Sequence, residues 1–150
     1  MIMSPTSLPF TLRPATLSDM AFLCQLRLKT MKPYFEHTYG WNDAEERHKA
    51  ADGLQHARIV VMGGEEVGMI KVIPKPAELH LDQMQIRPEL QGKGVGAELL
   101  RQTIHRSEAL QIPTTLFVIT HSPAKRLYER FGFEVTDVHE HHCTMSRGLG

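Results

Sequence analysis

The segment Gln91-Gly92-Lys93-Gly94-Val95-Gly96 is the part of the sequence whose residue types and spacing point most directly to chemistry. It lies between a strand-like run that ends at Ile86 and a helix-like run that begins near Val95. Glycine lets the main chain turn tightly and lie close to a ligand, because no Cβ stands in the way. The free N–H groups and the positive dipole end of the following helix point back at such a loop. The pattern therefore predicts a main-chain site for a phosphate group.

A dinucleotide-binding loop is one interpretation of these glycines, because Gly92, Gly94 and Ala97 fit a variant of its fingerprint. That fingerprint turns directly from the first strand into the first helix. Here Arg87-Pro88-Glu89-Leu90 separates the loop from the preceding strand, and too little chain follows for several more βα units. A different nucleotide-binding protein is therefore a secondary hypothesis, which a comparison of CoA and NAD binding by calorimetry would decide.

The same segment also matches the pattern Gln-x-x-Gly-x-Gly through Gln91, Gly94 and Gly96, and Met84-x-Ile86-x-Pro88 precedes it. These residues resemble the pyrophosphate loop of the GNAT superfamily of acyl-CoA-dependent N-acetyltransferases. Residues 123–133, PAKRLYERFGF, are in turn similar to the family's segment Asn-x-x-Ala-x-x-Leu-Tyr-x-x-x-Gly-Phe. Two separated motifs in the family's order make the resemblance much more specific than either motif alone.

The resemblance covers residues 10–147 and implies a single N-acetyltransferase domain within residues 1–150. It implies that an acetyl group moves from acetyl-CoA, which leaves as CoA, to a primary amine of a small molecule or peptide by direct attack in a ternary complex. A non-catalytic acyl-CoA-binding sensor on the same fold is the alternative; it would bind CoA without amine-dependent thiol release. The residues expected to contact the cofactor are Met84, Gln85, Ile86, Gln91, Gly92, Lys93, Gly94, Val95, Gly96, Ser122 and Tyr128. Ser122, or His121 with a one-residue shift, stands where the family often has an asparagine.

Acyl transfer requires that the amine loses a proton, that the thioester carbonyl is polarised and that the leaving thiolate is protonated. By the resemblance, Tyr128 lies beside the thioester sulfur and is the expected acid or orienting group. Its alternative role is ordinary core, because Tyr128 also belongs to an apolar helical stripe with Ala124, Leu127 and Phe131. A strand N–H, that of Ile86 or its neighbour, is expected to hold the oxyanion.

His80 is the candidate base, because an imidazole titrates near pH ~6.5. Some members of the family carry a catalytic glutamate at this distance before the loop. A half-exposed strand histidine, or one that only lines the acceptor pocket, is the alternative. Glu78 and Asp82 on the same strand are fallback candidates, and a chain of water molecules is a further alternative.

Residues 31–41, MKPYFEHTYGW, hold five aromatic or histidine rings and one carboxylate. So many rings would be costly to expose on a plain surface loop. By the resemblance, this segment closes over the acceptor. Glu36 would attract a cationic amine, and Tyr34, Tyr39 and Trp41 would form an apolar or cation–π wall. A hydrophobic plug that packs the helix ends is the alternative.

The run His139-Glu140-His141-His142-Cys143 resembles a metal-binding tract, but no second ligand cluster would complete a tetrahedral shell. We therefore expect no metal there, and an edge or turn near the acceptor cleft instead.

The composition is that of a small soluble enzyme. Lys and Arg number 17, as do Asp and Glu, so no global charge would recruit nucleic acid or an anionic membrane. No apolar run approaches the length of a membrane span, and the first residues lack the basic and apolar regions of a secretion signal. The two cysteines, Cys24 and Cys143, are far apart, which favours a reducing cytoplasm. The sequence is also compatible with a homodimer.

Periodicity and turn signals predict the elements that must position these residues. In chain order they are a strand at 10–13, a capped helix from Thr16 that ends at or near Pro33, a helix opened by Asn42 to Glu45, strands at 58–62 and 67–73 around Gly63-Gly64, a strand at 78–86, a helix at 95–110, a strand at 114–119, a helix from Ser122-Pro123 to Gly132, and strands at 133–138 and 143–147.

The strand at 78–86 carries a sign of irregularity, because Leu79 and Leu81 have one parity whereas Met84 and Ile86 have the other. An extra residue near Asp82-Gln83 would bring both pairs to one face, which indicates a β-bulge; a strand buried on both faces is the alternative. In the GNAT family a splayed strand pair here forms the cleft for the pantetheine arm. We expect an α/β (α+β) protein with the GNAT fold, in which a mixed, mostly antiparallel sheet of six to seven strands is splayed between strands 4 and 5 and flanked by about four helices.

Overall fold

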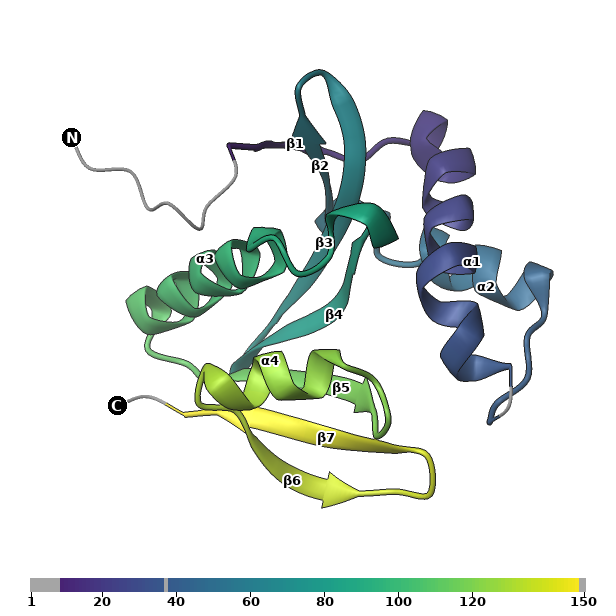
Figure 1. Cartoon of the computed structure of the whole chain (residues 1–150). Helices are drawn as coiled ribbons and strands as arrows, with labels where there is room; N and C mark the ends of the chain where they lie inside the picture. The colour runs from purple at the N-terminus through teal and green to yellow at the C-terminus, as the bar shows by residue number, and fades with distance from the viewer. Residues whose placement is uncertain (1–8, 37, 149–150) are drawn as a thin grey trace. The chain divides into compact units, whose positions relative to one another are not determined.

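The computed structural model describes residues 9–36 and 38–148, which form seven strands and four α-helices (Figure 1). The strands are β1 (Thr11–Pro14), β2 (Ala57–Met62), β3 (Glu65–Lys75), β4 (Glu78–Ile86), β5 (Thr114–Ile119), β6 (Glu134–Val138) and β7 (His142–Arg147). The helices are α1 (Met20–Phe35), α2 (Asp43–Ala51), α3 (Val95–Leu110) and α4 (Ala124–Arg130). The first residues of the chain, on which the expectation about a secretion signal rests, lie outside the described residues.

The strands form one sheet in the order β1-β2-β3-β4-β5-β7-β6. β4 and β5 pair in parallel, whereas β1–β2, β2–β3, β5–β7 and β6–β7 pair antiparallel. The parallel register joins Leu79–Leu81 to Thr114–Leu116, and both strands continue beyond it. This confirms the predicted mixed sheet, and the short parallel register fits the predicted splay. The bulge near Asp82-Gln83 stays a prediction.

The contacts of the chain divide it into two compact units. The first contains the residues up to Lys71 together with Gln83–Leu99, and the second contains Val72–Asp82 and the residues from Leu100 onward. The single domain stays a prediction.

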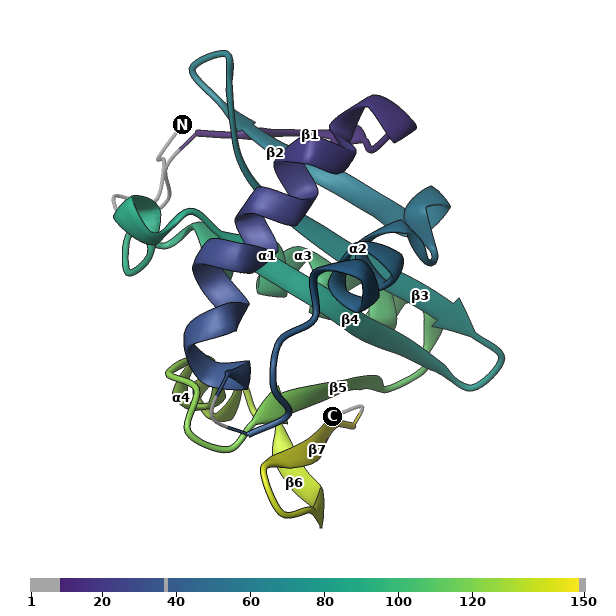
Figure 2. The same cartoon turned by 90° about the vertical axis from the view of Figure 1, so that its right-hand side faces the viewer.

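In the first unit, α1 and α2 cover one face of the β1–β2–β3 part of the sheet (Figure 2). The alternating strand positions Ala57, Ile59 and Met69 supply the sheet side of this core. The helix side comes from Met20, Leu23, Leu26 and Ala50. The hairpin between β2 and β3 turns at Gly63 and Gly64, whose φ values of 57° and 80° lie in the left-handed region that glycine adopts without a Cβ penalty.

A fully buried lysine holds the end of α2 in this core. Lys71 lies on the same face of β3 as Met69, with none of its surface exposed. Its Nζ donates to the carbonyl oxygens of Lys49 (3.1 Å), Ala50 (3.4 Å) and Asp52 (2.5 Å). A cation at the C-terminus of a helix bonds carbonyls that lack helical partners, so Lys71 fixes α2 against the sheet.

In the second unit, the face of β5 and β7 that carries Leu116, Val118, Cys143 and Met145 is buried, and α4 runs beside these strands (Figure 1). The Tyr128 and Phe133 rings are also buried, with their centroids 5.8 Å apart. Gly132 follows α4 with φ of 90°, which confirms the predicted glycine at the end of that helix. Arg147 Nε donates to the Phe131 carbonyl at 2.8 Å and ties β7 to the end of α4.

The predicted order of elements is confirmed, and the bounds of β4, α3 and β5 agree with the prediction to the residue. The prediction for Pro33 is wrong, because α1 continues through it to Phe35. Proline removes a single N–H donor, and here the helix end gains bonds beyond it: the amides of Thr38, Tyr39 and Gly40 all donate to the Phe35 carbonyl. The stripe on α4 is also narrower than predicted, since Tyr128 alone is buried in that helix.

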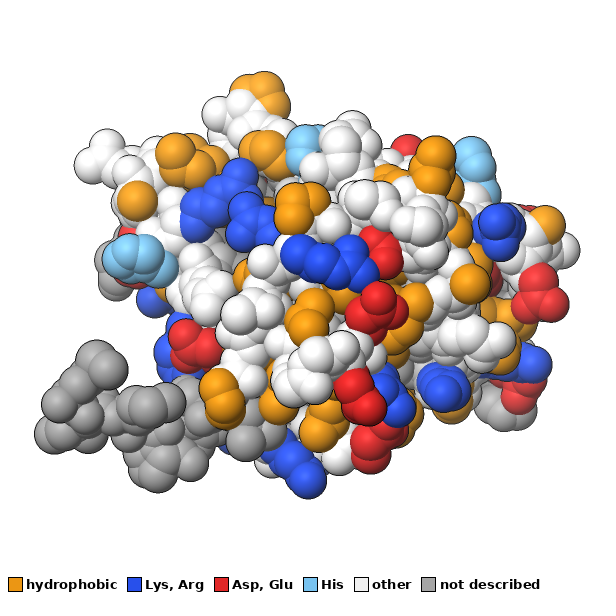
Figure 3. All heavy atoms as spheres, turned by 90° about the horizontal axis from the view of Figure 1, so that it is seen from above, with side chains coloured by type: hydrophobic (Ala, Val, Ile, Leu, Met, Phe, Trp, Pro, Cys, Tyr) orange, Lys and Arg blue, Asp and Glu red, His pale blue; other side chains and the backbone are white. Residues whose placement is uncertain are grey.

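The surface drawn in Figure 3 mixes Lys and Arg side chains with Asp and Glu side chains, in line with the formal net charge of zero. Among the described residues, the longest helices are too short and too polar to cross a membrane.

Candidate active site

The glycine loop of the first unit has the geometry of a main-chain anion site. β4 ends at Ile86, a 3-10 turn covers Pro88–Leu90, and α3 begins at Val95. Gly92 and Gly94 have φ values of 78° and 91°, a region that residues with a Cβ rarely adopt. The first helical bond of α3 runs from the Glu98 amide to the Gly94 carbonyl at 3.0 Å, so the N–H groups before it lie outside the helical ladder.

One side chain anchors this loop to the strand before it. Gln91 Nε2 donates to the Ile86 carbonyl at 2.9 Å. A second bond runs from the Arg87 amide to the Val67 carbonyl at 2.9 Å and fixes the same strand end on β3. The N-terminus of α3 and the end of β4 are therefore held together within the first unit, where the sequence predicted a contact with the cofactor.

β3 approaches the end of β4 more closely than any side chain would permit. A Cβ built on Gly68 would lie 2.6 Å from the Gln85 carbonyl oxygen and 2.8 Å from Ile86 Cδ1. A backbone oxygen cannot move aside as a flexible side chain can, so position 68 requires glycine. The register of β2 against β3 shifts between Val60 and Val61, next to this point. Sequence reasoning missed Gly68, because a single glycine within a strand does not reveal which backbone it faces.

The main chain of the loop is accessible at its first glycine. A Cβ at Gly92 would meet nothing within 4 Å, so the main chain there is open to a ligand. Gln91 and Lys93 are exposed beside it, whereas the Val95 side chain is buried at 1 % exposure and leaves only its main chain for contact. Helix N–H groups and a lysine match a polyanion. Of the strand residues predicted to contact the cofactor, Gln85 and Ile86 are buried and Met84 is half-buried.

Tyr128 and Ser122 lie in the second unit. Tyr128 is 6 % exposed, and burial raises the pKa of its hydroxyl to about 12. A thiol of cysteine type titrates near ~8.5, so full proton transfer from this phenol to a thiolate is uphill by roughly 3 to 4 pKa units. Hydrogen-bond donation requires no such transfer. Ser122 Oγ accepts from the Ala124 amide at 3.2 Å, just before α4, whose N-cap position is Pro123.

His80 lies in the second unit with one ring nitrogen engaged. Its Nδ1 is 2.9 Å from Thr115 Oγ1, and its Nε2 is 3.8 Å from an Asp82 carboxylate oxygen. Burial lowers the pKa of His80 below 6.5, and the positive charge of Lys75 adds to that effect against the opposing charges of Asp82 and Glu78. The imidazole is therefore neutral at pH 7. When Nδ1 carries its proton and donates to Thr115, Nε2 is free to accept one.

The rings predicted to bind the acceptor form a cluster around the last turn of α1. Phe35, at 6 % exposure, makes edge contacts with Tyr39 at 5.7 Å and with Trp41 at 6.2 Å. Trp41 Nε1 donates to an Asp43 oxygen at 3.0 Å, and Lys49 Nζ lies 5.4 Å from the Phe35 ring centroid. Tyr39 keeps 48 % of its surface exposed, so the cluster packs the helix end and still presents a ring outward. These contacts are compatible with both expectations for this segment, a wall of the acceptor site and a hydrophobic plug that packs the helix ends.

The two remaining predicted acceptor residues are placed differently. Glu36 is exposed and lies 3.8 Å from Lys32 Nζ, so a neighbouring cation already offsets its charge. Tyr34 is half-buried on the last turns of α1. If Glu36 binds a cationic amine as predicted, Lys32 would weaken that attraction.

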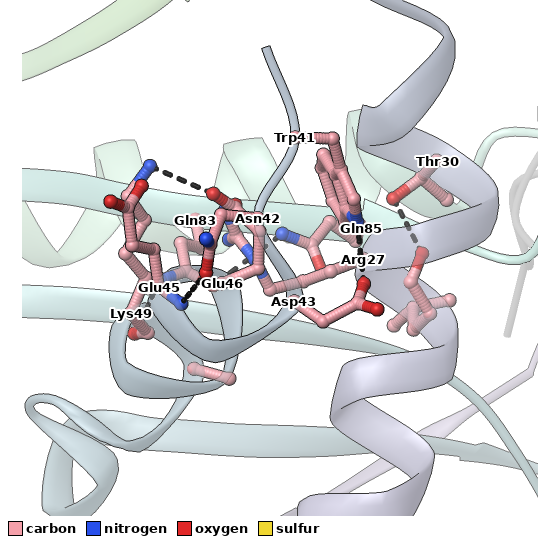
Figure 4. A network of polar contacts seen from close by, with 12 residues as sticks. Arg27, Thr30, Trp41, Asn42, Asp43, Glu45, Glu46, Lys49, Gln83 and Gln85 are labelled. Atoms are coloured by element: carbon pink, nitrogen blue, oxygen red, sulfur yellow. Dashed lines mark hydrogen bonds and ion pairs between the residues drawn. The ribbon is translucent and has the colours of Figure 1, made fainter. Parts of the chain in front are cut away.

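A buried polar network joins α1, α2 and β4 in the first unit (Figure 4). Arg27 Nη2 donates to Glu46 Oε1 at 2.5 Å, and their side chains are only 4 % and 7 % exposed. Lys49 Nζ bonds the other Glu46 oxygen at 3.0 Å. Gln83 Nε2 donates to the Lys49 carbonyl at 3.2 Å, and Gln85 Nε2 lies 3.4 Å from Gln83 Oε1. The network connects the two helices to the residue before Ile86.

Sequence reasoning missed this network. Arg27 lies four residues after Leu23 and seven after Met20, so it occupies the buried stripe of α1, and this polar residue in an apolar stripe was the available signal. Its partner Glu46 looked like any other charged residue of a polar helix. Among the described residues, Arg27 Nε and Gln85 Oε1 are buried without a hydrogen-bond partner.

The histidine tract forms the hairpin between β6 and β7. The His139 amide donates to the His142 carbonyl at 2.8 Å, and the two rings stack with centroids 4.4 Å apart. Within the described part of the chain, no three His, Cys, Asp or Glu side chains are grouped to hold a metal ion.

Comparison with known proteins gives a consistent result. The model of the acetyltransferase (GNAT) domain family matches residues 30–143. None of the curated proteins matches the chain.

Three solved structures illustrate the likeness in fold. The PaiA N-acetyltransferase from Thermoplasma acidophilum, in complex with coenzyme A, superposes with a TM-score of 0.79 at 15% identity, over 95% of this chain and all of that one. A GCN5-related N-acetyltransferase from Rhodopseudomonas palustris gives 0.74 at 20% identity over 99% of both chains. The ribosomal-protein-S18-alanine N-acetyltransferase from Escherichia coli gives 0.71 at 16% identity over 94% of both.

The family model covers most of the chain, and the fold and the glycine loop described above agree with it. The chain belongs to the GNAT acetyltransferase family.

Proposed function

We propose that this protein transfers an acetyl group from acetyl-CoA to a primary amine of a small molecule or a peptide, by direct attack within a ternary complex. Membership of the GNAT family makes the chain an acyltransferase that uses acetyl-CoA. The observation that carries the proposal is the glycine loop at the start of α3, which Gln91 ties to the end of β4 at 2.9 Å. With its diphosphate held at this loop, a long cofactor would lie along β4.

Bound acetyl-CoA would supply the acetyl group as a thioester and leave as a thiol. The N–H groups of residues 92–96 would hold its diphosphate, and Lys93 would add a positive charge. The N–H of Ile86 would donate to the thioester oxygen as negative charge develops there. Gly68 supports this role, because the close approach of β3 fixes where Ile86 lies.

Proton transfer would involve two residues of the second unit. The neutral His80 would accept the amine proton at Nε2 while Nδ1 donates to Thr115. A bond then forms between the amine nitrogen and the acetyl carbon, and the bond from that carbon to sulfur breaks. Tyr128 would donate a hydrogen bond to the leaving thiolate, which its raised pKa permits without full ionisation, and the thiolate would then take a proton from water to become the thiol.

Amine-dependent release of thiol from acetyl-CoA, measured over a panel of primary amines, tests this function. The proposal expects release that increases with amine concentration and an acetylated amine detected by mass spectrometry. CoA binding without any amine-dependent release would instead identify the alternative, an acyl-CoA-binding sensor.

We further propose that the protein acts in the cytoplasm. Cys24 is half-buried and Cys143 buried, and both are free thiols, the state that a reducing compartment maintains. Mass spectrometry of the thiols in protein taken directly from cells would test this, and a disulfide between copies of the chain would contradict it.

A further inference from the structure

One face of the sheet in the second unit carries two rows of side chains that cross the strands. Paired residues of neighbouring strands share a face, so the pairing defines both rows. The first row is His80 on β4, Thr115 on β5, Ser146 on β7 and Glu134 on β6. The second row is Phe117 on β5, Thr144 on β7 and Asp137 on β6. We call these seven residues the strip.

The two rows share one face because Thr115 and Phe117 lie two residues apart on β5, as Thr144 and Ser146 do on β7. His80 Nδ1 meets Thr115 Oγ1 at 2.9 Å, and Thr144 Oγ1 donates to Asp137 Oδ2 at 3.4 Å. The opposite face carries Leu116 and Met145, which are each 1 % exposed. On the strip, Phe117 is 43 % exposed and Thr115, Thr144 and Ser146 are half-buried.

The strip is acidic at both ends and uncharged between them. Glu134 and Asp137, both exposed, mark the end on β6. At the other end, the Asp82 carboxylate lies 3.8 Å from His80 Nε2. Arg147 is the sole Lys or Arg in β5, β6 and β7, and it pairs with Thr114 on the opposite face. Lys75 of β3 is the cation whose field reaches His80.

The middle of the strip suits an aliphatic chain. Thr115, Ser146 and Thr144 are small, and Phe117 adds an apolar ring. The centroid of the His142 ring lies 4.1 Å from that of the Phe117 ring. His142 pairs with Ile119, two residues beyond Phe117 on β5. Burial is the main cause that lowers the pKa of His142 below 6.5, so at neutral pH this ring adds no positive charge.

The length of the strip follows from the strand spacing. Neighbouring strands lie about 4.8 Å apart, so three spacings separate His80 from Glu134 by roughly 14 Å. β7, in the middle of the strip, has a ladder on each side, so its main-chain groups are occupied. A peptide laid across the middle of the strip would therefore have only hydroxyls with which to pair its own main chain, whereas an aliphatic chain has no main-chain groups to satisfy.

We propose that the strip binds an elongated aliphatic diamine as the acetyl acceptor. One amine lies at His80 and is acetylated, and the second, still an ammonium, lies at Glu134 and Asp137. The Phe117 ring and the hydroxyls line the chain between them. This inference rests on the proposed function, because it takes the amine at His80 to be the group that reacts.

Diamines and monoamines of matched chain length test whether the strip binds a second amine. A series of α,ω-diamines is compared with monoamines of the same chain length, and kcat and KM are measured for each. The variants are Glu134→Gln and Asp137→Asn, singly and together. Glu129→Gln is the matched control for the single variants, because it also removes one negative charge. Glu129 is exposed on α4 of the same unit, away from the strip.

The wild type should prefer diamines to matched monoamines by roughly 10-fold in kcat/KM, with the preference growing until the chain spans the strip. The double variant should lose this preference through KM, while kcat and monoamine activity stay unchanged. Glu129→Gln should keep it. Equal use of diamines and monoamines, or a preference that survives the double variant, overturns the inference.

A binding measurement separates this inference from the proposed function. Calorimetry with an unreactive bis(trimethylammonium) alkane, in the presence of CoA, measures occupation of the strip without turnover. Wild-type protein could acetylate no amine but bind this dication, while the double variant fails to bind it. That result would support binding at the strip and contradict the transferase function. If the dication fails to bind while monoamines are acetylated, the result supports the transferase function and contradicts binding at the strip.

Discussion

Removing either partner of the Arg27–Glu46 pair should destabilise the protein strongly. Both side chains are nearly fully buried, so a variant that deletes one leaves the other charge in a poorly solvating interior. The cost of such an uncompensated buried charge is about 3–5 kcal/mol. For a chain of this length, that corresponds to a fall in Tm of about 6–20 °C.

The two single variants should differ. In Arg27→Met, Glu46 keeps Lys49 at 3.0 Å, so the cost should lie near the lower end of the range. In Glu46→Leu, the Arg27 guanidinium loses its carboxylate altogether, and the cost should lie near the upper end. The double variant replaces a buried ion pair by apolar side chains of similar size, which is often neutral. Its cost should therefore be about 2 kcal/mol or more below the sum of the single costs.

Urea denaturation of the four proteins measures these free energies. The m-value serves as the check that the unfolding transition stays comparable among variants. Single costs below about 1 kcal/mol that simply add would refute the account, because they would show that the pair is solvated or formed only weakly.

The same pair predicts a pH dependence. Burial alone would raise the pKa of Glu46, but hydrogen bonds from Arg27 and Lys49 outweigh it and hold that pKa below 4.5. The group therefore contributes stability above pH 4.5, which is lost as the pH falls through the folded-state pKa. Acid titration of wild type against the double variant should show this loss in wild type alone.

Three further predictions concern the proposed site. Gly68→Ala should cost about 1–3 kcal/mol and raise KM for acetyl-CoA, because its Cβ would meet the Gln85 carbonyl at 2.6 Å; Gly148→Ala, which meets nothing within 4 Å, is the control, and equal behaviour of the two would argue against a role for the close approach. Tyr128→Phe keeps the buried ring and should change stability little, while kcat falls by about 10–10³-fold. If kcat is unchanged although chemistry is rate-limiting, Tyr128 has only a packing role. In wild type, kcat/KM should rise with pH through an apparent pKa below 6.5, the direction in which burial moves His80, and His80→Ala should remove that limb; a limb that survives and follows the pKa of the acceptor would assign deprotonation to water.

Much of the fold could be predicted from the sequence, because its signals are local. The Gly63-Gly64 turn, the Asn42 cap and the glycine after α4 each act within a few residues, and each is confirmed. Pro33 is the exception. Its effect on α1 depends on contacts of the following loop, which periodicity does not show.

The candidate site divides in the same way. The glycine loop is a contiguous motif, so it could be read directly, and Gly92 and Gly94 in it have left-handed φ values. The Arg27–Glu46 pair, the buried Lys71 and the approach of Gly68 to Gln85 join segments far apart in the chain. Such contacts depend on register and packing, and residue types alone do not specify them. The carboxylates of β6 share this property, since only the strand pairing places them in one row with His80.

CoA binding to the glycine loop tests the central claim most directly. Calorimetry should show that wild-type protein binds CoA and that Gly94→Val does not, because φ of 91° at this position disfavours a branched side chain in a loop that is proposed to bind CoA through main-chain amides. Gly148→Val, in open space, should bind CoA as wild type does, and circular dichroism should show both variants folded. A folded Gly94→Val protein that binds CoA as tightly as wild type would contradict the account.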